Sequence, residues 1–262
     1  NVYGGGVYVN GGILESCKIH GNLLKNSNSN YLYGAGVAMT NGIITDCEIY
    51  DNEVYNTYSY SYTICGGVYV KNNSSTKKAR IENCYVHDNI SHGISGGMYL
   101  DGYNSSNYVE VVNSRIENNA SEQNGGGLYL SNYVTLVGCN ISNNTSKYNG
   151  AGIYASNYVN VINCNVVNNH INTTSGSYNG AGIYGSSYAN IYNCVIWGNK
   201  KADVSDNVYF SGNTNVVVSH SAIEGGYTGI GNINLFSSNT GDGIHPMFVN
   251  PTEGSGKDYY HG

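Results

Sequence analysis

Carboxylates and imidazoles recur at matching places in this chain, and such groups could act as general acids and bases. Asp51 and Asp88 hold the same position in successive repeats, near Glu117, His20 and His87. Hydrolysis of a glycosidic bond needs two carboxylates roughly 5 to 10 Å apart. An acid/base pair or a weak calcium site is therefore one interpretation of Asp51 and Asp88. A solvated polar face is the interpretation that we favour.

Six of the seven cysteines hold one repeated position: Cys17, Cys47, Cys84, Cys139, Cys164 and Cys194. Thiols stacked one strand apart, with side chains pointing the same way, have poor geometry for a disulfide. A single-file column also cannot supply the converging ligands that zinc requires. We therefore expect reduced thiols that pack as small apolar residues, with no metal site and no cofactor.

The 27 tyrosines offer a third kind of chemistry. One outward column, here named the tyrosine floor, consists of Tyr8, Ala38, Tyr69, Tyr99, Tyr129, Tyr154, Tyr184 and Tyr209. A second tyrosine column consists of Tyr108, Tyr133, Tyr158 and Tyr188. Such rings either stabilise the sheet by cross-strand contact or present apolar faces and hydroxyls to a partner. The predicted binding residues are Tyr69, Tyr99, Tyr129, Tyr154, Tyr184, Tyr108, Tyr133 and Tyr158.

The elements that position these residues follow from an internal repeat. GAGIYASNYVNVINCNVVNN at 150–169 returns as GAGIYGSSYANIYNCVIWGN at 180–199. A repeat of this length indicates a solenoid or similar array. Within each repeat, apolar and polar residues alternate with the period of two that is typical of strands. No segment keeps a helical apolar pattern.

Each repeat is expected to contain three short strands, with a sharp bend before the third. The last residue of that bend is usually Gly, Asn or Asp, the residues that best tolerate positive φ. The eight residues at this position are Ser16, Asp46, Asn83, Asn113, Gly138, Asn163, Asn193 and His220. Two columns of inward apolar residues should fill the core. One begins at Val7 and the other at Leu14, and each continues at the matching position of the following repeats. A column of asparagines follows the cysteines: Asn22, Asn52, Asn89, Asn119, Asn144, Asn169 and Asn199. Buried amides in register can hydrogen-bond along such a ladder.

These patterns predict an all-β fold, a parallel β-helix of about eight coils over residues 1–226, with a capping tail over 227–262 in the same domain. Insertions enlarge the turns that border the first strand, at 23–35, 53–66, 71–78, 101–107 and 170–181. The outward face of that strand, which carries the tyrosine floor, should therefore be walled by loops.

Composition limits the partners. Charged residues are only 11% and the net charge is −6, which argues against nucleic acid because a basic stripe is missing. No run of about 18 apolar residues could span a membrane, and no signal peptide is evident. We expect a monomer that is a fragment or a mature product.

The chain resembles right-handed parallel β-helix surface proteins of the polymorphic outer-membrane and choice-of-anchor type, found in bacteria. The GGG/GAG-apolar-Tyr start and the Cys-x-Ile/Val-x-x-Asn end of each repeat match over residues 4–226. VVVSHSAIEGGYTGIGNINL (216–235), HPMFVNP (245–251) and Asp258-Tyr259-Tyr260 resemble the closing segment of such proteins. The resemblance implies export, display at the cell surface or secretion, and an adhesin-like role without a catalytic motif.

The expected function is therefore non-catalytic binding of a glycan or host-surface protein through the tyrosine-rich face. One alternative is a polysaccharide lyase or glycoside hydrolase, since parallel β-helices commonly host both. The tyrosine floor, however, offers no acid or base. A further alternative is an inert stalk that spaces another domain from the cell.

Overall fold

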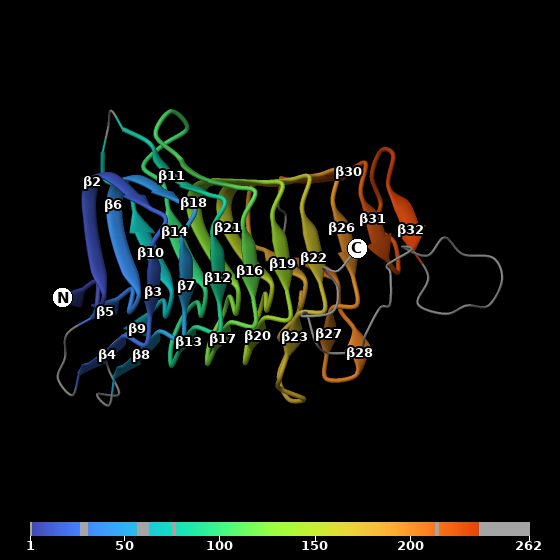
Figure 1. Ribbon diagram of the computed structural model, residues 1–262. Coiled ribbons are helices and arrows are strands. Elements are labelled where there is room, and N and C mark those ends of the chain that lie inside the picture. The colour runs from blue at the N-terminus through green and yellow to red at the C-terminus, as the bar shows by residue number, and fades with distance from the viewer. Residues whose placement is uncertain (1, 27–30, 57–62, 75–76, 213–214, 236–262) are drawn as a thin grey trace.

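The computed structural model describes residues 2–26, 31–56, 63–74, 77–212 and 215–235. Over these ranges the chain contains β-strands and turns, and no helix. No membrane-spanning helix is therefore found in the part described. Repeats stack in a row from the N-terminal to the C-terminal end (Figure 1), and almost every strand pairs in parallel with its counterpart in the next repeat.

In the described residues the strands form four sheets. The twelve-stranded sheet contains β2 (Val7–Glu15), β6 (Val37–Thr45), β10 (Val68–Lys71), β11 (Ala79–Glu82), β14 (Met98–Asp101), β15 (Val109–Val112), β18 (Leu128–Val137), β21 (Ile153–Ile162), β24 (Ile183–Gly185), β25 (Ala189–Tyr192), β29 (Val208–Phe210) and β30 (Val216–Ser219). The nine-stranded sheet contains β3 (Lys18–His20), β7 (Glu48–Tyr50), β12 (Tyr85–His87), β16 (Arg115–Glu117), β19 (Asn140–Ser142), β22 (Asn165–Val167), β26 (Val195–Trp197), β31 (Ala222–Glu224) and β32 (Ile233–Leu235).

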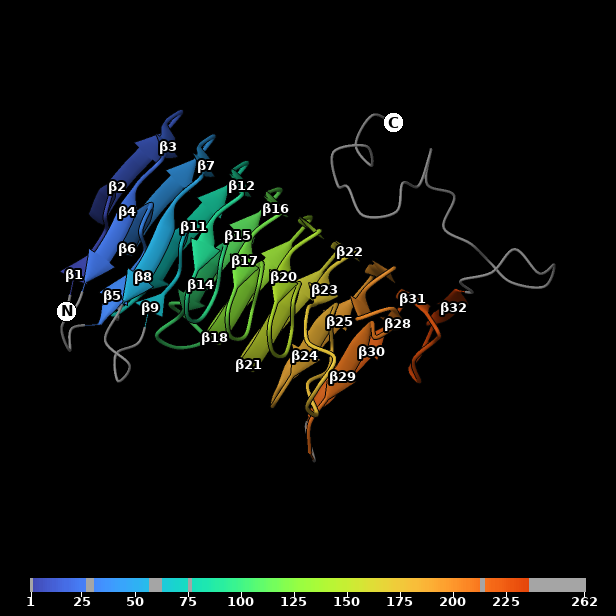
Figure 2. The same ribbon diagram turned by 90° about the horizontal axis from the view of Figure 1, so that it is seen from below.

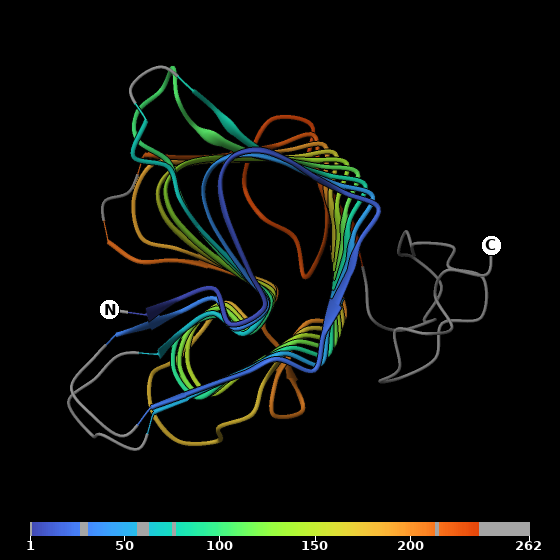
Figure 3. The ribbon, with the colours of Figure 1, turned by 60° about the vertical axis from the view of Figure 1, so that its left-hand side comes forward.

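Two smaller sheets complete the walls. The eight-stranded sheet contains β4 (Leu23–Asn26), β8 (Glu53–Asn56), β13 (Ile90–Ser91), β17 (Ala120–Ser121), β20 (Thr145–Ser146), β23 (His170–Ile171), β27 (Lys200–Lys201) and β28 (Val204–Ser205). The three-stranded sheet contains β1 (Val2–Tyr3), β5 (Leu32–Tyr33) and β9 (Thr63–Ile64). In the view from below, the strands lie side by side along the row of repeats (Figure 2). In a view that looks nearly along this row, successive repeats lie behind one another (Figure 3).

The prediction of a single right-handed parallel β-helix is wrong. The twelve-stranded sheet contains a closed ring of six parallel strands, in the order β6, β10, β14, β18, β15, β11 and back to β6. β6 pairs with β10 through its first residues and with β11 through its last. β18 pairs in the same way with β14 and β15. The ring arises because the insertions at 71–78 and 101–107 split two repeats, while the flanking repeats keep one continuous strand.

The prediction of three short strands in each repeat is also wrong. The segment after the asparagine column forms strands of its own, which make up the eight-stranded sheet. This sheet includes one antiparallel pair, β27 with β28. The sequence pattern did not reveal these strands because most of them are only two residues long and end in loops of different length.

The predicted interior columns are confirmed. Val37 pairs in register with Val68, and Ile44 with Ile81, and all four side chains are fully buried. The eight bend residues from Ser16 to His220 all have positive φ, between 47° and 64°. A second left-handed position, directly before the asparagine column, was missed: it holds Gly21, Asp51, Asp88, Asn118, Asn143, Asn168, Gly198 and Gly225.

The asparagine column forms a continuous hydrogen-bonded ladder. Asn144 donates from its backbone N and from Nδ2 to Oδ1 of Asn169, each at 3.0 Å. Asn144 Nδ2 also donates to the carbonyl of Ile116 at 2.9 Å. The amides therefore satisfy both one another and the backbone of the turn, as the sequence predicted.

Parts of the sequence prediction lie outside the described residues. Within the predicted loops these are 27–30, 57–62 and 75–76, and within the predicted tail 236–262. The first part of that tail includes β32, which pairs with β31 and extends the nine-stranded sheet.

Candidate functional site

The tyrosine floor is a stack of rings that cover one another. From Tyr69 through Tyr99, Tyr129, Tyr154 and Tyr184 to Tyr209, neighbouring ring centroids are 4.6 to 5.7 Å apart, with interplanar angles of 13 to 19°. This spacing follows from the in-register pairing of parallel strands.

Stacking covers much of the inner floor rings, whereas Tyr8 and Tyr209 at the two ends stay exposed. Tyr69 is only 5% exposed. Burial raises the pKa of four of its phenols: Tyr69, Tyr99, Tyr129 and Tyr154. Because each inner ring face already contacts a neighbouring tyrosine, a ligand can reach the inner floor rings only at their edges.

The second tyrosine column is more open and lines a groove. Tyr158 and Tyr188 are 42% and 44% exposed. Their ring centroids are 4.8 Å apart, and Tyr133 stacks on Tyr158 at the same distance. With Tyr108 they form one wall of a cavity of about 330 Å³. We name this cavity the tyrosine–amide groove.

The other wall of the groove is a ladder of polar side chains: Thr135, Asn160 and Asn190. Asn160 Nδ2 donates to Thr135 Oγ1 at 3.2 Å, and Asn190 Nδ2 donates to Asn160 Oδ1 at 2.9 Å. These residues lie on β18, β21 and β25, where they point outward between buried residues such as Val159 and Val161. A side-chain amide has two donor hydrogens, so this ladder leaves further hydrogen-bonding capacity in the groove.

Two groove tyrosines have an unusual backbone conformation. Tyr133 and Tyr158 have φ of 47° and 52°, in the left-handed region that bulky residues rarely adopt. A residue held there costs on the order of 1 to 3 kcal/mol, and such positions concentrate at functional sites. In both cases the residue lies within a long continuous strand, β18 or β21, so the bend turns the ring relative to the rest of the strand.

Charge is confined to one end of the groove. The residues that line it include no Asp, Glu, His, Lys or Arg. Lys78 lies beside Tyr108, with its Nζ 4.4 Å from the ring centroid and 3.2 Å from the phenolic oxygen. The groove can therefore recognise an uncharged ligand by hydrogen bonds and apolar contact.

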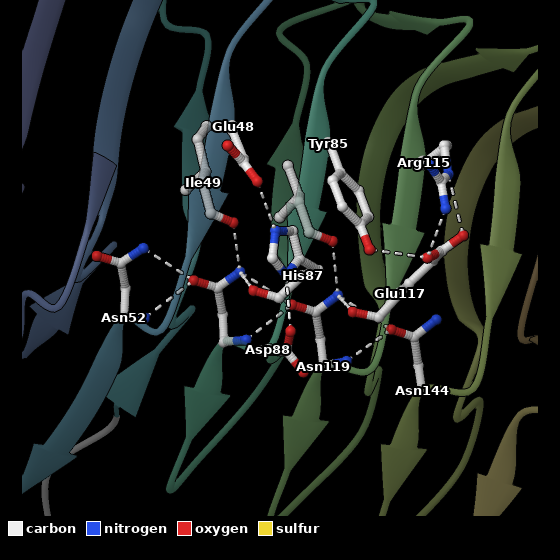
Figure 4. A network of polar contacts seen from close by, with 12 residues as sticks. Glu48, Ile49, Asn52, Tyr85, His87, Asp88, Arg115, Glu117, Asn119 and Asn144 are labelled. Carbon is white, nitrogen blue, oxygen red and sulfur yellow. Dashed lines mark hydrogen bonds and ion pairs between the residues drawn. The ribbon is translucent and has the colours of Figure 1, made fainter. Parts of the chain in front are cut away.

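His87, Asp88 and Glu117 lie in or directly beside the nine-stranded sheet, in the network of Figure 4. His87 contacts Asp88 through Nδ1 at 2.6 Å and Glu48 through Nε2 at 3.4 Å. Lys18 lies 2.6 Å from Glu48 and, with His87, lowers the pKa of that carboxyl. Glu48 is thus held in its ionised form, which suits an ion pair rather than a general acid.

Glu117, one of the three carboxylates that the sequence singled out, is also paired. Glu117, only 1% exposed, accepts hydrogen bonds from Arg115 at 3.1 and 3.2 Å and from the Tyr85 hydroxyl at 3.1 Å. His20 stacks on Tyr50, with ring centroids 4.7 Å apart. Asp51 follows Tyr50, the strand partner of His87, so it lies one strand from Asp88. Among the residues described, no group of three or more His, Cys, Asp or Glu side chains could hold a metal ion.

Sequence reasoning found the four groove tyrosines but missed the amide wall. The signal was present: Asn160 and Asn190 each occupy the outward position between two inward residues of the second strand. Asparagine is so common in this chain that the pattern did not stand out.

Comparison with known proteins gave no relative to guide the assignment: no family model, no curated protein and no solved structure matches this chain.

Proposed function

We propose that this chain is a non-catalytic binding protein that takes an uncharged, chain-like glycan in the tyrosine–amide groove. The observation that carries the proposal is the pairing of two parallel ladders, phenol rings on one wall and hydroxyl or amide groups on the other. Both ladders repeat at the spacing of the strands. A polymer with many hydroxyls could therefore repeat the same contacts from one repeat to the next.

The contacts available favour sugar over an apolar ligand. Tyr158 and Tyr188 expose ring edges and hydroxyls, since their faces are partly covered by stacking. Two residues further along the chain, Asn160 and Asn190 provide donors and acceptors in the same groove. A rigid aromatic and amide surface of this kind is typical of adaptable recognition sites.

The expected affinity of one site is low. A ring contact adds about 0.5 to 1.5 kcal/mol, and a neutral hydrogen bond contributes a similar net amount. Useful avidity would then come from several contacts along one chain or from many displayed copies. Because the groove walls are uncharged, binding should depend only weakly on salt.

This function fits a protein displayed on a bacterial cell surface or secreted, with a glycan or host-surface partner, as the family resemblance implies. The stalk alternative has one observation in its favour, the mutual coverage of the floor rings, which stabilises the stack without any ligand. That observation explains the floor but not the open groove.

The test is a glycan array that compares the parent with two double variants. Tyr158→Phe with Tyr188→Phe keeps the stacked rings and removes the groove hydroxyls. Tyr99→Ala with Tyr129→Ala, in contrast, removes the centre of the tyrosine floor. We expect the parent and the floor variant to bind the same neutral glycans and the groove variant to lose them. Loss only in the floor variant would transfer the function to the floor, and an array with no neutral glycan bound by the parent would overturn the proposal.

A further inference from the structure

The tyrosine–amide groove repeats one unit on three successive repeats. In each unit a tyrosine is followed, two residues later, by a polar and uncharged side chain: Tyr133 with Thr135, Tyr158 with Asn160, and Tyr188 with Asn190. We call these three pairs the levels of the groove. Thr135 pairs in register with Asn160, and Asn160 with Asn190. Neighbouring rings have centroids 4.8 Å apart at both steps, so the levels form an evenly spaced row.

Each level offers hydrogen bonds from a phenol and from an amide or hydroxyl. Asn190 Nδ2 donates to Asn160 Oδ1, and Asn160 Nδ2 donates to Thr135 Oγ1. A side-chain amide has two donor hydrogens and two acceptor sites on its oxygen. The bonds within the ladder therefore leave each asparagine a donor and an acceptor site for a ligand.

A charged pair ends the row on its N-terminal side. Glu110 is the residue in register with Thr135, and it is bound in an ion pair to Arg80, its partner on the next strand. The tyrosine of this repeat is Tyr108, whose hydroxyl oxygen accepts a hydrogen bond from Lys78 Nζ at 3.2 Å. A sugar at this position would have to displace water from charged groups, which is costly.

An aliphatic side chain ends the row on its C-terminal side. Val217 pairs in register with Asn190 and is 57% exposed. Its side chain has no donor or acceptor for a sugar hydroxyl. In the same repeat Asn215 takes the place of the tyrosine. The run of levels that combine a phenol with an uncharged hydrogen-bonding group is therefore limited to three repeats.

We infer that the groove has three subsites, and that its ligand is an unbranched chain of β-1,4-linked pyranose sugars with one sugar at each level. This inference rests on the proposed function and adds the linkage and the number of sugars. The levels recur at the strand spacing of about 4.8 Å, and an extended β-1,4-linked chain advances by nearly the same distance for each sugar. A chain with α-1,4 linkages curls, so its sugars cannot follow the row.

The mixed character of each level suits this linkage. In an extended β-1,4-linked chain each sugar is turned over relative to the sugar before it, so successive levels meet opposite edges of the sugar ring. One edge carries secondary hydroxyls and the other carries the hydroxymethyl group. A phenol and an amide both donate and accept hydrogen bonds, so either edge finds a partner at every level.

The experiment measures affinity by calorimetry for β-1,4-linked oligosaccharides of glucose, mannose and N-acetylglucosamine, from the disaccharide to the tetrasaccharide, beside the α-1,4-linked glucose series. For the sugar that binds best, the dissociation constant should fall about fivefold from the disaccharide to the trisaccharide, the scale of one neutral hydrogen bond. From the trisaccharide to the tetrasaccharide it should fall by no more than about twofold, because three adjacent sugars can be chosen from four in two ways. The α-1,4-linked trisaccharide should bind at least about fivefold more weakly than the best β-1,4-linked one.

Val217→Asn tests the length of the row, because it continues the amide ladder by one level at an exposed position. In this variant the tetrasaccharide should bind about fivefold more tightly than the trisaccharide. Val217→Ala, which removes the valine without adding an amide, is the matched control and should keep the length dependence of the parent.

Asn160→Ala tests the middle level. It should weaken the trisaccharide about fivefold or more, since it removes both a ligand contact and the centre of the ladder. Asn165→Ala removes an exposed ladder amide on the nine-stranded sheet instead, and it should leave every affinity unchanged.

The outcomes separate this inference from the proposed function. If the parent binds no neutral glycan, on the array or in these titrations, the proposed function fails and the inference fails with it. If neutral glycans bind but none is β-1,4-linked, or the α-1,4-linked trisaccharide binds equally well, the function stands and the inference is overturned. An affinity of the parent that rises by equal steps beyond three sugars, or a Val217→Asn variant with the length dependence of the parent, would also overturn it.

Discussion

Gly152 lies directly against the side-chain amide of Asn169. A Cβ on Gly152 would stand 2.8 Å from Asn169 Nδ2 and 2.7 Å from the carbonyl oxygen of Gly182. The same contact recurs at Gly36 with Asn52 and at Gly182 with Asn199. The two most regular features of the sequence, the glycine column and the asparagine column, are therefore one packing unit.

Gly152→Ala should destabilise the protein by about 1 to 3 kcal/mol, the usual cost of forcing extra atoms into a packed interior. The conflict includes backbone as well as an amide held by hydrogen bonds, so neither neighbour can move freely. Urea denaturation of the variant beside Ser156→Ala, a position that already carries a Cβ, measures the effect. Equal stability of the two variants would contradict this account of the glycine column.

Asn144→Ala should cost about 3 kcal/mol or more, because it leaves buried partners without hydrogen bonds. Asn144 is fully buried and also accepts bonds from the backbone N and Nδ2 of Asn119, each at 3.0 Å. Asn165→Ala is the matched control, since that exposed amide makes one ladder bond, to Asn140 at 2.7 Å. Its cost should stay within about 0.5 kcal/mol. Similar denaturation midpoints would show that the buried ladder contributes no more than the exposed one.

Alkaline pH should unfold the protein through the tyrosine floor. Burial raises the pKa of Tyr69 and Tyr129 in the folded state, while an unfolded tyrosine ionises near pH 10. The stabilisation is thus complete below about pH 10 and is lost as the pH rises toward the folded pKa, by up to about 1.4 kcal/mol per pH unit for each ring. Denaturation midpoints across this range, with phenolate absorbance, give the slope. Tyr129→Phe should flatten it, and an unchanged slope would assign alkaline unfolding to other groups.

Thiol reagents should distinguish one cysteine from the other six. All seven are free, and Cys17 alone is not buried. Burial raises the pKa of Cys84 to about 12, which suppresses its reactive thiolate as well as access to it. We expect at most one thiol to react in the native protein and the rest only after unfolding. Rapid reaction of six or more in the native state would be incompatible with an interior column.

Polysaccharide turnover should be absent. Glu117 is buried in ion pairs and hydrogen bonds, and the lowered pKa of Glu48 leaves it no proton to donate near neutral pH. Reducing-end and unsaturated-product assays on acidic and neutral glycans measure this directly. If turnover appears and Asp51→Asn or Asp88→Asn abolishes it, the enzyme alternative replaces the binding one.

The sequence by itself determined the columns. Inward residues such as Val161 and Ile191, the left-handed bends at Asn163 and Asn193, and the stacked amides at Asn169 and Asn199 were all predicted. They could be predicted because each is a local requirement repeated at the same place: alternation of period two, tolerance of positive φ, and register between identical neighbours.

Only the tertiary structure decided how the walls close and where they are open. The closed ring of strands forms because some repeats keep one continuous strand, such as β18, while others have two separate strands, such as β14 and β15. The insertion between β14 and β15 causes this split. The groove lined by Tyr158 and Asn160 likewise depends on the distances between outward side chains. Periodicity shows that such side chains face outward, but how closely they stack, and where a gap remains, depends on how neighbouring repeats pack.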